Sequence, residues 1–310
     1  VADVIIRDNI FFNDFAGSGR ANPNDTSSFI VIKNSAALPE SRRIRVHRNV
    51  FLNWEGSPGS NFVLVGEDGQ PFHEAEEVLV ENNLMIGNSA NRMRAPFGVK
   101  GGKTITFRNN TVAGDLPSNA FAMRLNREGR NPVNEQILFF NNIWSDPTGT
   151  MEDFADGEPA ETAGAELDNN LYWNGGQPIP TGPDVLNYTD DRRRLVADPR
   201  LGAQSGVVLP RWTGDRFLSG NRTIRQEFER LVMLYGAPLA GSAVIGRADP
   251  PRAPLDDILG RRRDPEPDLG AFEVNTRFPE PRAVVDAAAF RPPLAPGGLA
   301  TLFGENLADI

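Results

Sequence analysis

Six stretches of the chain share one pattern, in which an apolar, β-branched run stops at two polar residues and then resumes. They read VIIRDNIFF, IRVHRNVFL, VLVENNLMI, ITFRNNTVA, ILFFNNIWS and AELDNNLYW. The second polar residue is always an asparagine, and the six lie 40, 34, 27, 32 and 28 residues apart: Asn9, Asn49, Asn83, Asn110, Asn142 and Asn170. Spacings in this range are typical of solenoid repeats.

The residues around each asparagine alternate. Five and three residues before it, every residue is apolar, whereas the residue two before it is polar in five of the six stretches. This period of two predicts a strand with one buried face, and a second short strand begins after the asparagine. A third strand is predicted at four segments that begin with phenylalanine: Phe29, Phe62, Phe97 and Phe121.

Each repeat is therefore expected to be a coil of about three strands that stacks on the next coil. We expect the asparagine to form the bend between the first two strands, because it tolerates left-handed backbone geometry. Its side-chain amide is expected to bond to the asparagine one coil away. Agreement of the columns over six repeats favours this solenoid over an antiparallel β-sandwich, which short alternating strands would also fit.

Residues 1–175 resemble the right-handed parallel β-helix of the pectate-lyase-like superfamily. The fold class implied is all-β, a solenoid with a mixed C-terminal cap over residues 176–275. Within that cap, RTIRQEFERLVMLYG predicts an amphipathic helix near residues 222–236. We expect this helix to cover an open end of the coil stack, because terminal repeats need a cap.

Two later segments also carry resemblances. APLAGSAVIGRAD and PLDDILGRRRDPEPDLGAFE are similar to the closing segment of secreted bacterial β-helix proteins. After a linker, RAVVDAAAFRPPLAPGGLATLFGENLAD resembles the start of an immunoglobulin-like module of secreted soil-bacterial proteins. Residues 276–310 are interpreted as this linker and a truncated module. Together the resemblances imply an exported protein, extracellular or on the cell surface.

Charge and composition exclude several classes of partner. A formal net charge of −9 argues against general nucleic-acid binding. No run approaches the roughly 18 apolar residues of a membrane helix, so membrane insertion is not expected. The chain has no cysteine, which excludes disulfides and thiol catalysis. We expect a monomer.

The resemblance implies an extended polysaccharide bound along a sheet. The Gly-His-Gly element of polygalacturonase-like hydrolases is missing, and the only histidines are His47 and His73. Lyases of this fold need a basic side chain as the base, and a cation such as Ca2+ or a second basic side chain to neutralise the uronate. The pectate-lyase motifs are missing too. The sequence leaves open whether the chain is an enzyme and whether Ca2+ binds; lyase chemistry ranks above hydrolysis, and no metal ligands are assigned.

Residues 92–130 hold eight basic residues against two acidic ones, which is +6 in a chain of −9. Alignment on the phenylalanines places Lys100 and Arg124 on successive coils, about 4.8 Å apart and pointing outward. Lys100 is the candidate base, because a neighbouring cation lowers a lysine pKa, and Arg124 is its catalytic partner. The simpler interpretation is a solvated basic face, neutralised by acidic loops such as residues 146–165.

Three further residues are candidates for substrate binding: Arg94, Arg108 and His47. The alignment puts Arg108 on a different sheet from Lys100. It places Glu81 opposite His47, either as an acid–base pair or as a surface contact between strands. The function expected first is engagement of an acidic polysaccharide, by lyase chemistry or by binding alone. The alternative is a noncatalytic cell-surface or adhesion solenoid, and a glycoside hydrolase ranks third.

Overall fold

The computed structural model describes residues 2–19, 28–36, 42–53, 61–88, 93–115, 120–274, 280–286 and 300–305. The chain divides into two compact units, Val1–Glu273 and Val274–Ile310. The described strands of the first unit form three sheets, and every strand pair in them is parallel. This arrangement confirms a parallel β-solenoid and rules out the antiparallel sandwich.

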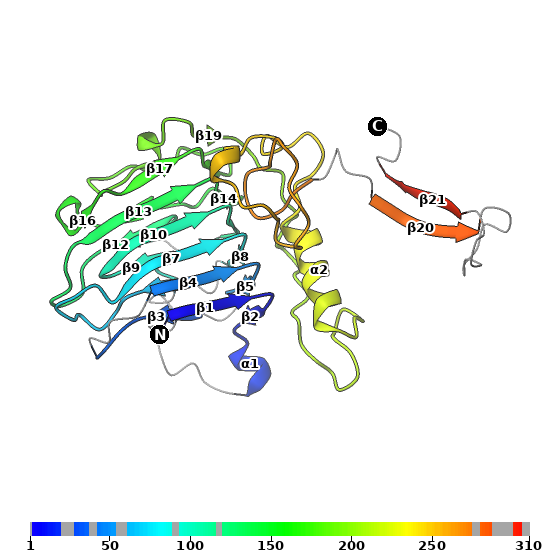
Figure 1. The fold of residues 1–310 in the computed structure, drawn as a ribbon, viewed down its shortest axis with the longest axis horizontal. Coiled ribbons are helices and arrows are strands. Elements are labelled where there is room, and N and C mark those ends of the chain that lie inside the picture. Colours follow the sequence, from blue (N-terminus) through cyan, green and yellow to red (C-terminus); the bar gives the residue numbers. More distant parts are fainter. Residues whose placement is uncertain are drawn as a thin grey trace. The chain divides into compact units, whose positions relative to one another are not determined.

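Each turn of the chain visits the three sheets in the same order, which we call A, B and C. Figure 1 shows successive strands of sheet A side by side, from blue to green. Sheet A contains β1 (Ala2–Arg7), β4 (Arg42–His47), β7 (Ala75–Glu81), β10 (Gly102–Arg108), β13 (Asn134–Phe140), β16 (Thr162–Ala163) and β17 (Glu166–Asp168). Sheet B contains β2 (Ile10–Phe12), β5 (Val50–Leu52), β8 (Leu84–Ile86), β11 (Thr111–Ala113), β14 (Ile143–Asp146), β18 (Leu171–Asn174) and β19 (Leu195–Val196). Sheet C contains β3 (Ile30–Ile32), β6 (Val63–Val65), β9 (Phe97–Val99), β12 (Met123–Leu125) and β15 (Ala155–Asp156).

The core lies inside the coils, where the predicted apolar columns stack. Ile105 pairs in register with Ile137, and Phe107 with Phe139. The Phe107 and Phe139 rings stack with their centroids 4.9 Å apart. Side chains of one column therefore bury one another from turn to turn, as the alternation predicts.

The predicted asparagine ladder is present. Each asparagine side chain donates to the side-chain oxygen of the next, over 2.9–3.1 Å, from Asn9 through to Asn170. The left-handed residue, however, is the one before each ladder asparagine: Asp8, Arg48, Asn82, Asn109, Asn141 and Asn169, with φ of 49–61°. The prediction that the ladder asparagine itself is left-handed is wrong. The preceding residue makes the turn, which leaves the ladder amide pointing along the stack.

An aspartate that the sequence pattern did not reveal terminates the ladder. Asp191 Oδ2 accepts from Asn170 N at 2.8 Å, from Asn170 Nδ2 at 2.9 Å and from the Tyr172 hydroxyl at 3.1 Å. Nearby, Ile179 and Leu186 are buried in the main core cluster. The segment around these residues therefore closes the C-terminal end of the coils.

The helix α2 spans Ile224–Tyr235, within the range where the sequence predicts a helix. Thr223 caps its start by accepting from Gln226 N at 3.2 Å. The helix lies against β5 of sheet B, beside the flank of the coils (Figure 1), and not across an open end as expected. The reason is that the outer face of sheet B is apolar, with Val50 and Leu84 fully buried.

The remaining short helices are α1 (Phe15–Ser18), η1 (Pro159–Glu161), η2 (Tyr188–Asp190) and η3 (Pro250–Arg252). No helix within the described residues is both long and apolar enough to span a membrane. In the second unit, β20 (Glu280–Asp286) pairs antiparallel with β21 (Ala300–Glu305). The rest of the predicted immunoglobulin-like start, residues 287–299 and 306–310, lies outside the described residues.

Residues 246–271, which we call the strap, are tied to the outside of the corner between sheets A and B. Four left-handed asparagines donate to strap carbonyls: Asn82 to Asp256, Asn109 to Asp268 and Gly270, Asn141 to Asp249, and Asn169 to Arg247. The two asparagines of each adjacent pair therefore have different partners. The second asparagine bonds within the ladder inside the coil, and the first bonds to the strap outside it.

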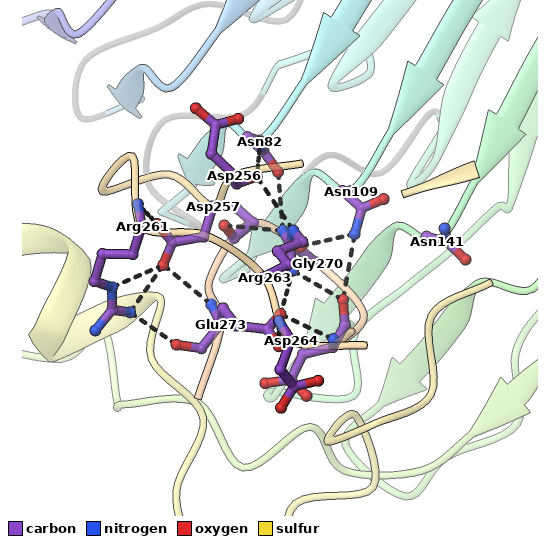
Figure 2. A network of polar contacts seen from close by, with 12 residues as sticks. Asn82, Asn109, Asn141, Asp256, Asp257, Arg261, Arg263, Asp264, Gly270 and Glu273 are labelled. Atoms are coloured by element: carbon purple, nitrogen blue, oxygen red, sulfur yellow. Dashed lines mark hydrogen bonds and ion pairs between the residues drawn. The ribbon is translucent and has the colours of Figure 1, made fainter. Parts of the chain in front are cut away.

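A buried ion pair fixes the strap further (Figure 2). The Arg263 side chain is 3% exposed and donates to Glu273 Oε2 at 2.8 Å, to Asn82 Oδ1 at 2.9 Å and to the Gly270 carbonyl at 2.7 Å. Burial raises the pKa of Glu273 to about 7, although Arg263 opposes the shift. The segment that resembles a bacterial closing motif thus supplies the polar network that docks the strap.

Candidate functional site

Lys100 and Arg124 do not face each other across successive strands. Arg124 pairs with Gly98, so Lys100 lies two positions further along its own strand direction. The predicted register is therefore wrong. Phe97 lies within its strand and pairs with Met123, whereas Phe121 precedes its strand by two residues, so the two phenylalanines are not equivalent.

Both residues nevertheless line one pocket on the outer face of sheet C, which we call the sheet C pocket. Its volume is about 320 Å³, and its lining comprises Asn61, Leu64, Glu67, Arg94, Lys100, Arg124 and Glu128. Gly98 stands between Leu64 and Arg124 in the sheet register. A Cβ on Gly98 would lie 2.8 Å from Leu64 Cδ1, so the missing side chain keeps the pocket floor open.

Each of the two predicted catalytic cations has an acidic partner. Lys100 Nζ lies 2.9 Å from Glu128 Oε2, and Arg124 Nε lies 2.9 Å from Asp156 Oδ2. Asp156 belongs to the acidic residues 146–165, which the solvated-face interpretation named as neutralising. Burial lowers the pKa of Arg124, Arg94 adds to this effect, and Asp156 opposes it. Lys100 donates to Glu128, so its Nζ is already engaged by a carboxylate and does not lie free in the pocket.

Arg94 has unused donors in this pocket. Its Nε is buried and has no hydrogen-bond partner, and the Arg124 Nε meets Asp156 as an ion pair without hydrogen-bond geometry. Among the residues that the structure describes, no carboxylate pairs with Arg94. Buried donors without an acceptor are rare and costly. The sheet C pocket can therefore offer hydrogen bonds and positive charge to an anion.

Arg108 and His47 lie on sheet A, away from the sheet C pocket, as the alignment indicated for Arg108. Both flank Glu81 in register, and Glu81 is fully buried. Arg45 Nε donates to Glu81 at 2.6 Å and Arg108 Nε at 2.7 Å. These arginines occupy the carboxylate, and no hydrogen bond joins His47 to Glu81 within the described part of the chain.

His47 is only 5% exposed, and its Nδ1 has no hydrogen-bond partner. Burial lowers the pKa of His47, and the charge of Arg45 lowers it further. The imidazole is therefore neutral near pH 7. The five predicted site residues thus form two groups: Arg94, Lys100 and Arg124 around the sheet C pocket, and His47 and Arg108 on sheet A.

Sequence reasoning missed the acidic lining residues Glu67 and Glu128 of the sheet C pocket. Glu128 lies within the basic segment 92–130, where its charge entered the net charge of the segment but gave no sign that it faces Lys100. Within the described ranges, no group of three or more histidine and acidic side chains is arranged to hold a metal ion. No protein-family model matches the chain, and no curated protein matches it. What the chain does is therefore inferred from its own side chains.

Proposed function

We propose that this chain is an exported bacterial protein that binds an acidic glycan in the sheet C pocket. We propose also that its coils form the right-handed parallel β-helix of the pectate-lyase-like superfamily. Parallel strands joined by crossovers are right-handed in nearly all proteins, which supports the hand. The resemblances of the closing segment and of the immunoglobulin-like start support export to the extracellular space or the cell surface.

The observation that carries the binding proposal is the buried Arg94 Nε without an acceptor. Arg94 shares the pocket with Lys100, which pairs with Glu128, and with Arg124, which pairs with Asp156. Of these three cations, only Arg94 has no carboxylate partner among the described residues. A carboxylate or sulfate group of a glycan would accept from Arg94 and balance the charge of this guanidinium group. The volume lies at the lower end of small-ligand pockets, about 300–1,000 Å³, which suits one charged unit of a longer chain.

Binding without cleavage is the form we favour, because Lys100 donates to Glu128 at 2.9 Å. A lyase base must be unprotonated and must reach the proton beside the uronate carboxylate. Lyase chemistry is the second candidate, since Lys100 and Arg124 line the same pocket and could act as base and carboxylate neutraliser. A noncatalytic adhesion solenoid and a glycoside hydrolase follow, with no structural observation in their favour.

The test is calorimetric titration of the full chain with oligosaccharides of alginate, polygalacturonate and chondroitin sulfate. We expect at least one to bind, and Arg94→Gln to weaken that binding about 10-fold or more, as loss of a charged hydrogen bond does. Arg130→Gln is the matched control, because Arg130 is exposed and does not line the pocket.

Two results would contradict the binding proposal. Either no acidic glycan binds, or Arg94→Gln and Arg130→Gln bind the glycan with equal affinity. The same mixtures, followed by ultraviolet absorbance of a new unsaturated uronate, decide between binding and lyase chemistry. A rise in absorbance that disappears in Lys100→Gln would replace binding by cleavage as the function of this pocket.

A further inference from the structure

A second and larger pocket lies between the outer face of sheet A and the strap. Its volume is about 650 Å³, and we call it the strap pocket. Its lining comprises Arg45, Arg108, Ala253, Pro254, Leu255, Asp256, Gly260 and Arg262. None of these residues lines the sheet C pocket. The coils supply two arginines, and the strap supplies the remaining wall.

The floor of the strap pocket carries an unbalanced charge. Arg45 and Arg108 both bind the one carboxylate of Glu81, which is fully buried. Arg45 uses Nε and Nη2 for this contact, so its Nη1 remains available. Two guanidinium groups against one carboxylate leave one positive charge in excess. Because Glu81 holds both side chains, the two guanidinium groups are fixed before any ligand arrives.

The strap adds a third guanidinium group. Arg262 is exposed, and its side chain has no ion-pair partner in the described part of the chain. The one carboxylate of the lining, Asp256, already pairs with Arg48, whose Nη1 lies 2.7 Å from Asp256 Oδ2. Arg48 also pairs with Asp8, so these two carboxylates share one guanidinium group and offset part of the local positive charge. Arg45 and Arg262 nevertheless keep free donors.

The opposite wall is apolar. Ala253, Pro254 and Leu255 follow one another along the strap, and Leu255 is 85% exposed. No other large apolar side chain among the described residues is more exposed. A largely exposed leucine beside three arginines suits a ligand that has both a negative group and an apolar face.

We propose that the strap pocket binds a small organic anion, with its carboxylate between Arg45 and Arg262 and its ring against Pro254 and Leu255. The ligand class is a carboxylate carried on a ring. This site does not depend on glycan binding in the sheet C pocket, because the two pockets share no residue.

The test uses the full chain and two probes in calorimetric titrations: benzoate, a carboxylate on a ring, and inorganic sulfate, an anion without one. We expect benzoate to bind and Arg262→Gln to weaken it about 10-fold. Leu255→Ser should weaken benzoate roughly 3- to 10-fold through lost apolar burial. Both side chains are exposed, so neither variant should disturb folding.

Two controls locate the effect. Arg247→Gln removes the same charge from an exposed position of the strap outside the pocket, and should leave benzoate binding unchanged. Arg94→Gln, in the sheet C pocket, should also leave it unchanged. Equal losses in Arg247→Gln and Arg262→Gln would overturn the site. Sulfate binding as tightly as benzoate, with no effect of Leu255→Ser, would overturn the ring contact and so the ligand class.

Discussion

Replacing Asn110 with alanine removes one step from the middle of the asparagine ladder. Asn110 Nδ2 donates to Asn142 Oδ1 at 3.0 Å and to the Val80 carbonyl at 2.9 Å. Its Oδ1 accepts from Asn83 Nδ2 at 2.9 Å and from the Asn83 backbone N–H at 3.1 Å. The variant therefore loses four hydrogen bonds in a fully buried place.

The four losses differ in cost. Asn142 Oδ1 still accepts from the backbone of residue 110, and Asn83 Nδ2 still donates to two carbonyls. The Asn83 backbone N–H keeps no acceptor, and a buried unsatisfied group costs about 1–3 kcal/mol. With the weaker losses and the small cavity, we expect a destabilisation on the order of 3–5 kcal/mol.

Asn9→Ala is the matched control, because Asn9 is exposed at the N-terminal end of the same ladder. Its amide donates to Asn49 Oδ1 and to the Arg7 carbonyl, which water can replace, so we expect a cost below about 1 kcal/mol. Urea unfolding followed by far-ultraviolet circular dichroism measures both. If Asn110→Ala and Asn9→Ala lower the free energy of unfolding equally, the ladder does not stabilise the coils as argued.

Three further predictions concern the end of the ladder, a buried histidine and the strap. Asp191→Asn should lower the free energy of unfolding by about 2–4 kcal/mol, because both carboxylate oxygens accept hydrogen bonds and an amide nitrogen in either place would face donors. An unchanged urea midpoint would contradict this. The folded-state pKa of His47 lies below its ordinary 6.5, so below pH 6.5 the unfolded chain takes up a proton at this residue that the folded chain does not. The contribution of His47 to the free energy of unfolding should therefore be complete above pH 6.5 and fall as the pH is lowered. In urea unfolding at several pH values, His47→Gln should lose free energy of unfolding less steeply on acidification than the wild type. Arg263→Ala should cost about 3–5 kcal/mol, because it leaves the buried Glu273 unpaired, and should speed proteolysis within the strap; strap cleavage at the wild-type rate would argue against this ion pair as its anchor.

The coils could be predicted because their stabilising contacts repeat. A residue such as Phe107 meets Phe139, its equivalent on the next turn, so the chemistry of the contact recurs in the sequence with the repeat. The ladder asparagines obey the same rule, and both were visible as columns. Asp191 was not visible in this way. It accepts from Asn170 as the next asparagine would, but it is an aspartate, and no strand of the repeated pattern precedes it.

The docking of the strap could not be predicted, because the strap residues that accept from the repeated asparagines do not themselves form a repeat. Asn82 reaches Asp256 across 174 residues, and Asn109 reaches Gly270 across 161. The strap pocket, with Arg262 in its wall, follows from this docking and leaves no periodic signal. In the sheet C pocket the three basic residues could be predicted but their register could not, because Phe121 resembles Phe97 in type and differs from it in position.

The strap also changes how the coils must come apart. In an ordinary solenoid each turn contacts only its neighbours, so a terminal turn can peel away while the others persist. Here one segment is bonded to Arg48, Asn82, Asn109, Asn141 and Asn169, which belong to five successive turns. Loosening any of these turns strains a tie shared by all of them. We therefore expect the five tied turns to unfold together and not one at a time.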